Sequence, residues 1–201
     1  MPKTERLRIT QSLLSAWEYS FKTDDGYEDF LRTLNREKKQ PTKQMLDGIR
    51  FENCLNNMLK GAGLPWDHEW YAVINEMANE LDGAQQQVTL FGEIDVDGQA
   101  FLLHGVLDYL REGHIFDCKF SKRYHLNKYH WTQTPQTAMY LALVPEAMDF
   151  TYIISDGDYV YRERYPREIV PSIEPEIRHF MEYLKKHGLW EIYKEKWSVT
   201  N

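Results

Sequence analysis

Two aspartates and a lysine stand in the most apolar part of the chain, the stretch HGVLDYLREGHIFDCKFSK at residues 104–122. Asp117 and Lys119 are two residues apart in an expected strand, so both side chains leave the same face. Asp108 lies on the preceding expected strand, and the short turn at 111–113 can bring its carboxylate close to Asp117. Burying such charges is costly unless they pair with one another or bind a metal ion.

The chemistry that suits these groups is attack on a phosphodiester. Two close carboxylates repel unless a cation or a proton lies between them, and oxygen ligands of this kind suit Mg²⁺ or Mn²⁺. A lysine beside the metal can orient or deprotonate a water molecule, or neutralise charge that develops in a transition state. The simpler interpretation of an isolated Asp-x-Lys is an ion pair on a half-exposed sheet edge, because surface pairs are common and contribute little.

A basic and aromatic stretch begins at Lys119. The net charge of −7 gives no global attraction for nucleic acid, yet no acidic residue occurs between Asp117 and Glu146. Such a stretch suits a surface that tracks phosphates and stacks unpaired bases. The candidate DNA contacts are Lys122, Arg123, Lys128, Tyr129, His130 and Trp131. The alternative is a solvated loop with some aromatics packed on the core, and that interpretation is preferred for the basic stretch at 35–43.

The hydrophobic spacing indicates which elements position these residues. Helical spacing dominates the first third, and alternation interrupted by Asp-Gly and Glu-Gly turns follows. We expect helices in 10–21, 24–39, 43–63, 68–83, 133–143 and 171–197, and strands in 85–110 (a hairpin), 114–121, 149–155 and 159–165.

The order of these elements predicts one α/β domain over residues 1–201. Its centre is a mixed, hairpin-rich β-sheet flanked by helices, with an N-terminal helical segment. The parts are a mainly helical region at 1–84, a sheet core with an inserted helix at 85–165, and C-terminal helices at 166–201.

The composition excludes several other classes of protein. A hydrophobic content of 42% and an aromatic content of 14% argue against disorder. The two cysteines, Cys54 and Cys118, form no C-x-x-C pair, which excludes a four-cysteine zinc or iron–sulfur site. The N-terminal stretch MPKTERLRIT lacks the apolar region of a signal peptide, and no apolar run could span a bilayer. We therefore expect a cytoplasmic protein that does not insert into a membrane.

Taken together, these motifs resemble the PD-(D/E)XK nuclease superfamily, and within it the RecB-like and phage exonuclease branch. The resemblance covers residues 10 to about 140 and keeps the family's order. It comprises the serine-containing opening helix ITQSLLSAWEYSF at 9–21, GIRFE at 48–52, GVLD ending at Asp108, the D-x-K element at 117–119 and QTAMY at 136–140. Leu107 replaces the family's proline, and Glu52 replaces the histidine of many RecB-like members, as in the phage exonuclease variant.

The resemblance implies a restriction-endonuclease-like core and a role for each matching residue. Glu52, Asp108, Asp117 and the backbone carbonyl of Cys118 would hold Mg²⁺ or Mn²⁺, Lys119 would position or activate the attacking water, Gln136 would hydrogen-bond near the lysine or the DNA backbone, and Tyr140 would buttress Gln136. The cysteines for an iron–sulfur cluster are missing, so none is expected. The alternatives are a surface glutamate at position 52 and an ordinary amphipathic helix face at 136–140.

The resulting functional hypothesis is a divalent-metal-dependent DNA nuclease. The family branch favours an exonuclease that acts on DNA ends in phage-type recombination or repair, with a recombination or annealing protein as a further candidate partner and homo-oligomer formation left open. The alternatives are a structure-selective endonuclease on the same core and a DNA-binding module without catalysis.

Overall fold

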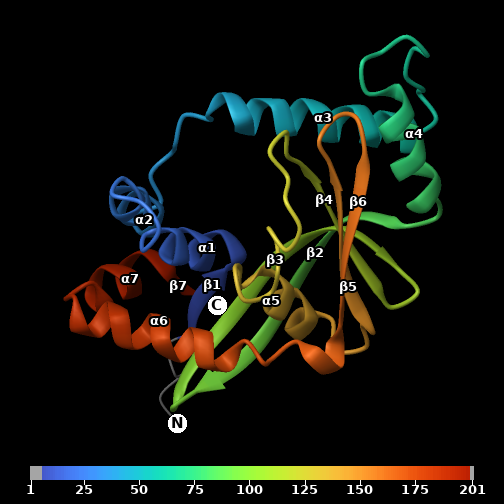
Figure 1. Cartoon of the computed structure of the whole chain (residues 1–201). Helices are drawn as coiled ribbons and strands as arrows, with labels where there is room; N and C mark the ends of the chain where they lie inside the picture. Colours follow the sequence, from blue (N-terminus) through green and yellow to red (C-terminus); the bar gives the residue numbers. More distant parts are fainter. Residues whose placement is uncertain (1–5, 200–201) are drawn as a thin grey trace.

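The computed structural model describes residues 6–199. It contains a seven-stranded mixed β-sheet flanked by helices (Figure 1), which confirms the predicted α/β fold class. The strands are β1 (Arg6–Thr10), β2 (Gln85–Val96), β3 (Gln99–Arg111), β4 (His114–Phe120), β5 (Asp149–Ser155), β6 (Val160–Pro166) and β7 (Ser198–Val199). The helices are α1 (Gln11–Tyr19), α2 (Gly26–Leu34), α3 (Lys43–Leu59), α4 (Tyr71–Glu80), α5 (Gln136–Leu143), α6 (Glu174–Lys186) and α7 (Trp190–Trp197), with a 3₁₀ turn at Arg167–Ile169.

Strand β3 is the branch point of the sheet because it pairs with three other strands, β1, β2 and β4. The strand order is β6-β5-β4-β3-β1-β7, and β2 pairs with β3 in a long antiparallel hairpin. On its other edge, β3 pairs in parallel with β1 at 101–104 and antiparallel with β4 at 109–111. Residues 105–108 of β3 therefore lie between the end of one ladder and the start of the next.

The hairpin turns lie where the sequence predicts them. Asp97 and Gly98 have φ angles of 53° and 81°, and Glu112 and Gly113 have 49° and 80°. Two successive residues with positive φ form the turn whose twist matches that of the flanking strands. The turn at 111–113 thus places β4 antiparallel to β3, which brings the two aspartates of the 104–122 stretch onto neighbouring strands.

Two hydrophobic clusters pack on the sheet. The larger cluster joins α1, α2, α5, α6 and α7 to the strands, and the smaller cluster joins α3 and α4 to the β3–β5 region. Strand β4 contributes to both, because Ile115 belongs to the larger cluster and Phe116 to the smaller one. Successive residues of a strand point to opposite faces, so α3 and α4 cover one face of β4 and α5 lies on the other.

The helix starts follow their capping residues. Thr10 accepts a hydrogen bond from the Leu13 amide, and Thr42 accepts one from the Met45 amide, each at 3.2 Å. Both threonines thereby satisfy an N–H group that the first helical turn leaves free. Thr42 directly precedes the helix that the sequence predicts from residue 43, and α3 begins there.

The main correction concerns the N-terminal segment. The hydrophobic spacing predicts only helices in the first third of the chain, but Arg6–Thr10 forms β1, which pairs with β3 and with β7. Five residues are too few to show a reliable alternation, and the partner strand lies almost a hundred residues away. Several helices are also shorter than expected; α4 begins at Tyr71 and α5 at Gln136. The first five residues of MPKTERLRIT lie outside the described part of the chain.

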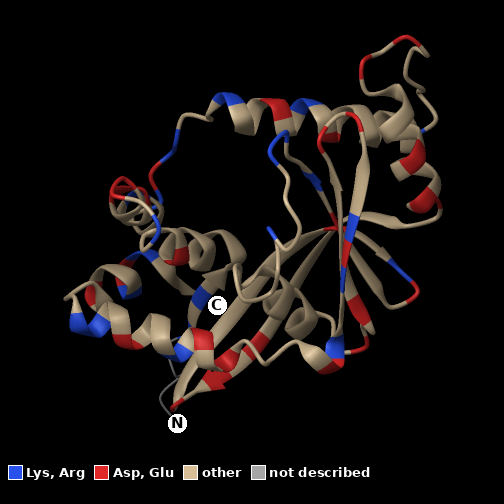
Figure 2. Cartoon of the chain, viewed as in Figure 1, with Lys and Arg blue, Asp and Glu red and all other residues tan. Residues whose placement is uncertain are grey.

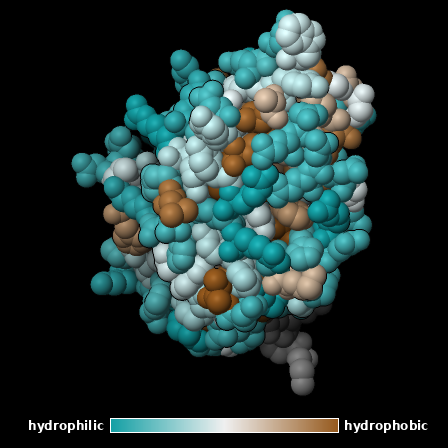
Figure 3. All heavy atoms as spheres, turned by 45° about the vertical axis from the view of Figure 1, so that its right-hand side comes forward, coloured by the Kyte–Doolittle hydropathy of each residue, from teal (hydrophilic) through white to brown (hydrophobic). Residues whose placement is uncertain are grey.

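Within residues 6–199, no helix is long and apolar enough to cross a membrane. On the face drawn in Figure 3, hydrophobic residues are scattered among hydrophilic ones and form no single broad patch. Buried polar groups gather at the β3–β4 pair.

Candidate active site

Strands β3 and β4 separate at the two aspartates. Their ladder ends at the pair Tyr109–Phe116, so the next opposed residues in the same register are Asp108 and Asp117. At this point the Cys118 amide donates to Asp108 Oδ2 at 3.1 Å. The acceptor of this strand N–H group is therefore a side-chain carboxylate and not a backbone carbonyl of β3. We call this place the strand fork, consisting of Asp108, Asp117, Cys118 and Lys119.

A local distortion of the β2–β3 hairpin points Asp108 into the fork. Leu107 and Tyr109 would share a face in a regular strand, yet Leu107 packs in the larger cluster and Tyr109 in the smaller one. The β2 residue opposite Asp108 is Gln87, which has a positive φ of 51°. The residues on either side of it, Gln86 and Val88, pair with β3, but Gln87 itself does not. Such distortions of a ladder re-aim side chains next to functional sites.

The Asp117 side chain is buried and contacts two other side chains. Its exposed fraction is 4%, and Lys119 Nζ lies 2.6 Å from Asp117 Oδ2. The side-chain amide of Gln136 donates to Asp117 Oδ1, and its own carbonyl accepts from the Tyr152 hydroxyl at 3.4 Å. The structure thus brings Asp108, Asp117, Lys119 and Gln136 together, although they come from three elements.

Glu52 reaches the same region from α3. Phe51 and Leu55 of that helix are buried in the smaller cluster, which holds α3 against the sheet. Glu52 Oε1 accepts from Gln87 Nε2 at 3.2 Å, and Gln87 is the residue opposite Asp108. The Glu52 charge contributes to raising the pKa of Asp108. Glu52 is therefore a half-buried carboxylate beside the fork, not a remote surface residue.

The electrostatics of the fork favour a cation. Burial and the neighbouring Asp117 charge raise the pKa of Asp108 from 3.8 to about 7. Burial lowers the pKa of Lys119, but the charges of Asp117 and Asp108 outweigh it and raise that pKa above its ordinary value of 10.5. A lysine held in its charged form neutralises negative charge better than it accepts a proton. Of the two roles predicted for Lys119, the arrangement favours charge neutralisation.

The donor set fits a hard divalent cation by its chemistry. Asp108, Asp117 and Glu52 supply carboxylate oxygens, which suit Mg²⁺ or Mn²⁺. Because the Cys118 N–H points at Asp108, the carbonyl of the same residue points to the same edge of β4. Within the described residues, no three His, Cys, Asp or Glu side chains are already arranged around a metal position. The amine of Lys119 holds Asp117 instead, so a cation would have to displace that contact.

The two residues that define the QTAMY motif on helix α5, Gln136 and Tyr140, make different contacts. Gln136 binds Asp117, whereas the Tyr140 hydroxyl donates to the Val106 carbonyl at 2.8 Å. Val106 lies in the part of β3 between its two ladders, so Tyr140 satisfies an edge carbonyl there. Gly105 makes this contact feasible, because a Cβ at this position would lie 2.5 Å from Tyr140 Cε1. These contacts pack Tyr140 against β3, and its predicted role at the site stays a prediction.

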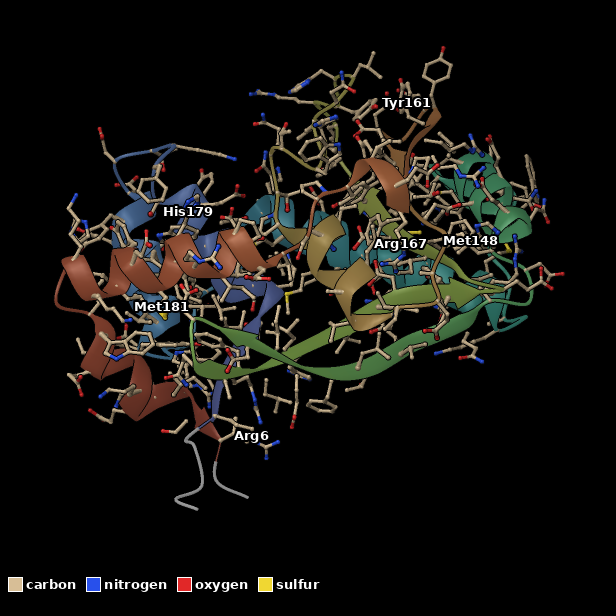
Figure 4. All side chains as sticks on the ribbon, turned by 90° about the horizontal axis from the view of Figure 1, so that it is seen from below. Arg6, Met148, Tyr161, Arg167, His179 and Met181 are labelled. Atoms are coloured by element: carbon tan, nitrogen blue, oxygen red, sulfur yellow. The ribbon has the colours of Figure 1, made fainter. Side chains whose placement is uncertain are left out.

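The C-terminal end of α5 is held by an arginine that the sequence analysis did not single out. Arg167 lies beside this helix (Figure 4) and donates to the carbonyls of Leu141, Val144 and Ala147 at 2.5–2.7 Å. A cation at this end satisfies free carbonyls and complements the helix dipole. Arg167 therefore fixes the helix that places Gln136 against Asp117.

The predicted DNA contacts divide into two groups. Lys122, Arg123, Lys128 and Tyr129 line a hollow of about 480 Å³ between the chain after β4 and the first turns of α3. The side of α3 contributes Lys43, Gln44 and Asp47. We call this the basic hollow. Lys43 ends the stretch at 35–43 that the sequence analysis interprets as a solvated loop, and its place here depends on tertiary structure that periodicity does not reveal.

The aromatic residues of this segment face largely inward. Tyr129 stacks on Tyr152 with ring centroids 5.3 Å apart, and Trp131 packs on the larger cluster. His130 packs edge-on against Tyr165. These contacts match the alternative interpretation, in which the aromatic residues pack on the core. Of the three predicted DNA contacts with rings, Tyr129 also lines the basic hollow.

A buried carboxylate anchors the same segment to the sheet. Glu163 of β6 is 5% exposed and accepts hydrogen bonds from the hydroxyls of Tyr124 and Tyr165 at 2.8 and 2.6 Å. Burial and the hydrogen bond to Glu163 raise the pKa of Tyr124 above its ordinary value, so the tyrosine remains a donor. The sequence offers no signal for this anchor except the alternation in YVYRERY.

No model of a known protein family matches the chain, and no curated protein matches its sequence. Among solved structures, the crystal structure of SSO0001 superposes with a TM-score of 0.54 at 16% identity. The match covers 90% of this chain and 77% of that one. At this identity the comparison shows a shared fold.

Proposed function

We propose that the protein is a divalent-metal-dependent DNA nuclease that hydrolyses phosphodiester bonds at the strand fork. The observation that carries this proposal is the juxtaposition of Asp108 and Asp117 with the charged amine of Lys119, 2.6 Å from Asp117. The resemblance to the PD-(D/E)XK superfamily supports an exonuclease acting on DNA ends in recombination or repair. A cytoplasmic location, self-association and a recombination or annealing partner fit that activity.

The burial of the fork supports a functional origin for its charges. Asp117 is almost completely buried and Asp108 carries a raised pKa, so the folded chain is less stable than it would be with neutral residues there. A fold gains nothing from this arrangement by itself. This loss of stability has a reason if the carboxylates bind a cation during function.

The chain's own residues would act on the phosphate in distinct ways. Glu52, Asp108, Asp117 and the Cys118 carbonyl would hold Mg²⁺ or Mn²⁺, which supplies a Lewis acid for the phosphate and for the attacking water. Lys119 keeps its proton and offsets negative charge that grows on the phosphate oxygens. Gln136 orients Asp117, and the hydrophobic clusters on both faces of β4 keep these groups in fixed positions.

The proposal is tested with purified protein on end-labelled linear duplex and on covalently closed circular DNA, each with Mg²⁺, Mn²⁺ or EDTA. We expect metal-dependent loss of the linear DNA, and loss of this activity in Asp117→Ala. Asp67→Ala, which removes an exposed carboxylate outside the fork, is the matched control and should retain activity.

Two outcomes would change the assignment. Nicking of the circle would indicate an endonuclease on the same fold, because an exonuclease needs an end. No cleavage of either DNA by the wild-type protein with any of the ions would contradict the nuclease proposal and favour a binding module.

A further inference from the structure

The basic hollow is lined by four cations that have no carboxylate partner among the described residues. Lys43, Lys122, Arg123 and Lys128 line it, and none of them lies within ion-pair distance of a carboxylate among residues 6–199. The acidic residue that lines it is Asp47. In Figure 2 the blue segments at the start of α3 and on the chain after β4 face the same region.

Several arginines elsewhere on the surface are paired with carboxylates within the fold. Arg162 binds Glu76 and Glu80, and Arg178 binds Asp97 and Glu174, at 2.7–2.9 Å. In an acidic protein with a net charge of −7, unpaired cations around one hollow make a local anion-binding surface. The repeated spacing of phosphates along a nucleic acid matches several cations better than a single small anion does.

The hollow adjoins the candidate active site along the chain. Phe120 and Ser121, which line it, directly follow Lys119 on the chain. Lys128 Nζ donates to Ser121 Oγ at 2.6 Å. Tyr129 lines the hollow and stacks on Tyr152, whose ring centroid is 6.0 Å from Lys119 Nζ. The hollow therefore begins at the residue that follows Lys119, at the end of β4.

We propose that the basic hollow binds an unpaired DNA strand and delivers it to the strand fork, so that the enzyme selects single-stranded over duplex DNA. This inference rests on the proposed function and adds the strand type. The hollow has walls on two sides, α3 and the chain after β4, and its volume of about 480 Å³ is in the range of about 300–1,000 Å³ that holds one small ligand. Its aromatic lining suits bases that are not paired with a second strand.

The contacts within the hollow suit this substrate. The four cations bind phosphates, and the rings of Phe120 and Tyr129 offer an apolar wall to a base or sugar. Both rings are fixed by stacking, on Phe51 and on Tyr152 respectively. Little side-chain freedom is lost when a strand binds to preformed walls of this kind.

The test measures binding by fluorescence anisotropy in EDTA, so that no cleavage occurs. The probes are fluorescein-labelled oligothymidylate and a blunt duplex of the same length, titrated with the full chain at several salt concentrations. Lys122→Ala/Arg123→Ala removes two exposed cations of the hollow. Lys60→Ala/Lys186→Ala removes the same charge from exposed positions elsewhere, at the C-terminal ends of α3 and α6.

We expect oligothymidylate to bind more tightly than the duplex. Four phosphate contacts predict a salt slope of about −2.8 for a single strand, and loss of two contacts predicts about −1.4. The control double variant should keep the wild-type slope. Unfolding midpoints equal to that of the wild type show that each variant is folded.

Equal affinity for the duplex would overturn the strand selectivity, and an equal loss in both double variants would overturn the role of the hollow. These failures are distinct from failure of the nuclease proposal. If the protein cleaves DNA but binds both probes equally, the nuclease proposal stands and the strand selectivity is refuted. If the protein prefers the single strand in EDTA but cleaves neither DNA with Mg²⁺ or Mn²⁺, the hollow is a binding site for single strands and the nuclease proposal is refuted.

Discussion

The carboxyl group of Asp108 should make the stability of this fold strongly dependent on pH. Burial and the charge of Asp117 raise its pKa from 3.8 to about 7, although Lys119 and the Cys118 amide act in the opposite direction. In the unfolded chain the pKa returns to about 3.9. The charged form of Asp108 is therefore less favourable in the folded chain than in the unfolded one.

The sign of the effect follows from this order of pKa values. A group whose folded-state pKa is raised contributes stability that is fully present below the unfolded-state pKa and is lost as the pH rises through about 7. A shift of about three units corresponds to up to about 4 kcal/mol. Asp108→Asn removes the ionisation and keeps an oxygen that accepts from the Cys118 amide. We expect it to match the wild type near pH 4 and to be more stable by up to about 4 kcal/mol near pH 8.

Urea unfolding followed by tryptophan fluorescence measures this difference across the pH range in EDTA. Asp67→Asn changes an exposed carboxyl group and should follow the wild type at every pH. Added Mg²⁺ should stabilise the wild type at high pH, since a cation offsets the repulsion at the fork, but should stabilise Asp108→Asn much less. Parallel pH curves for Asp108→Asn and the wild type would refute the assignment of the buried charge.

Four further substitutions test the elements that support the site, three by urea unfolding and one by limited proteolysis. Gly105→Ala places a Cβ 2.5 Å from Tyr140 Cε1 and should lower the free energy of unfolding by about 1–3 kcal/mol. In the control Gly48→Ala, the added Cβ meets nothing within 4 Å, so this change should stabilise α3 by roughly 0.5–1 kcal/mol. Equal effects of the two substitutions would contradict the packing described for β3. Tyr140→Phe leaves an edge carbonyl of β3 without its donor and should cost about 1–3 kcal/mol, and an unchanged midpoint would show that this hydrogen bond is dispensable. Tyr124→Phe releases the segment at 121–135 from buried Glu163 and should speed its cleavage by trypsin, and an unchanged cleavage rate would rule out the anchor.

Much of the fold was predictable because its signals are local. The turns at Asp97-Gly98 and Glu112-Gly113 require residues that tolerate positive φ, and these are the residues present. Thr42 caps α3 through its own side chain. The common face of Asp117 and Lys119 follows from the two-residue repeat of a strand, and their contact is confirmed by the distance of 2.6 Å.

The remaining features depend on contacts between distant parts of the chain. Strand β1 is stabilised by pairing with β3, and nothing within its five residues signals that partner. The change of face between Leu107 and Tyr109 depends on the conformation of Gln87 in another strand. Lys43 joins the basic hollow because α3 begins beside the segment after β4, a relation that no local pattern contains.

We propose above that the strand fork hydrolyses DNA with the help of Lys119. The most direct test is one time course of linear DNA loss in Mg²⁺ and in EDTA, with the wild type and Lys119→Met side by side and both shown to be folded. We predict metal-dependent degradation by the wild type and none by Lys119→Met. Equal rates for the two proteins, or no metal-dependent degradation by the wild type, would contradict the account.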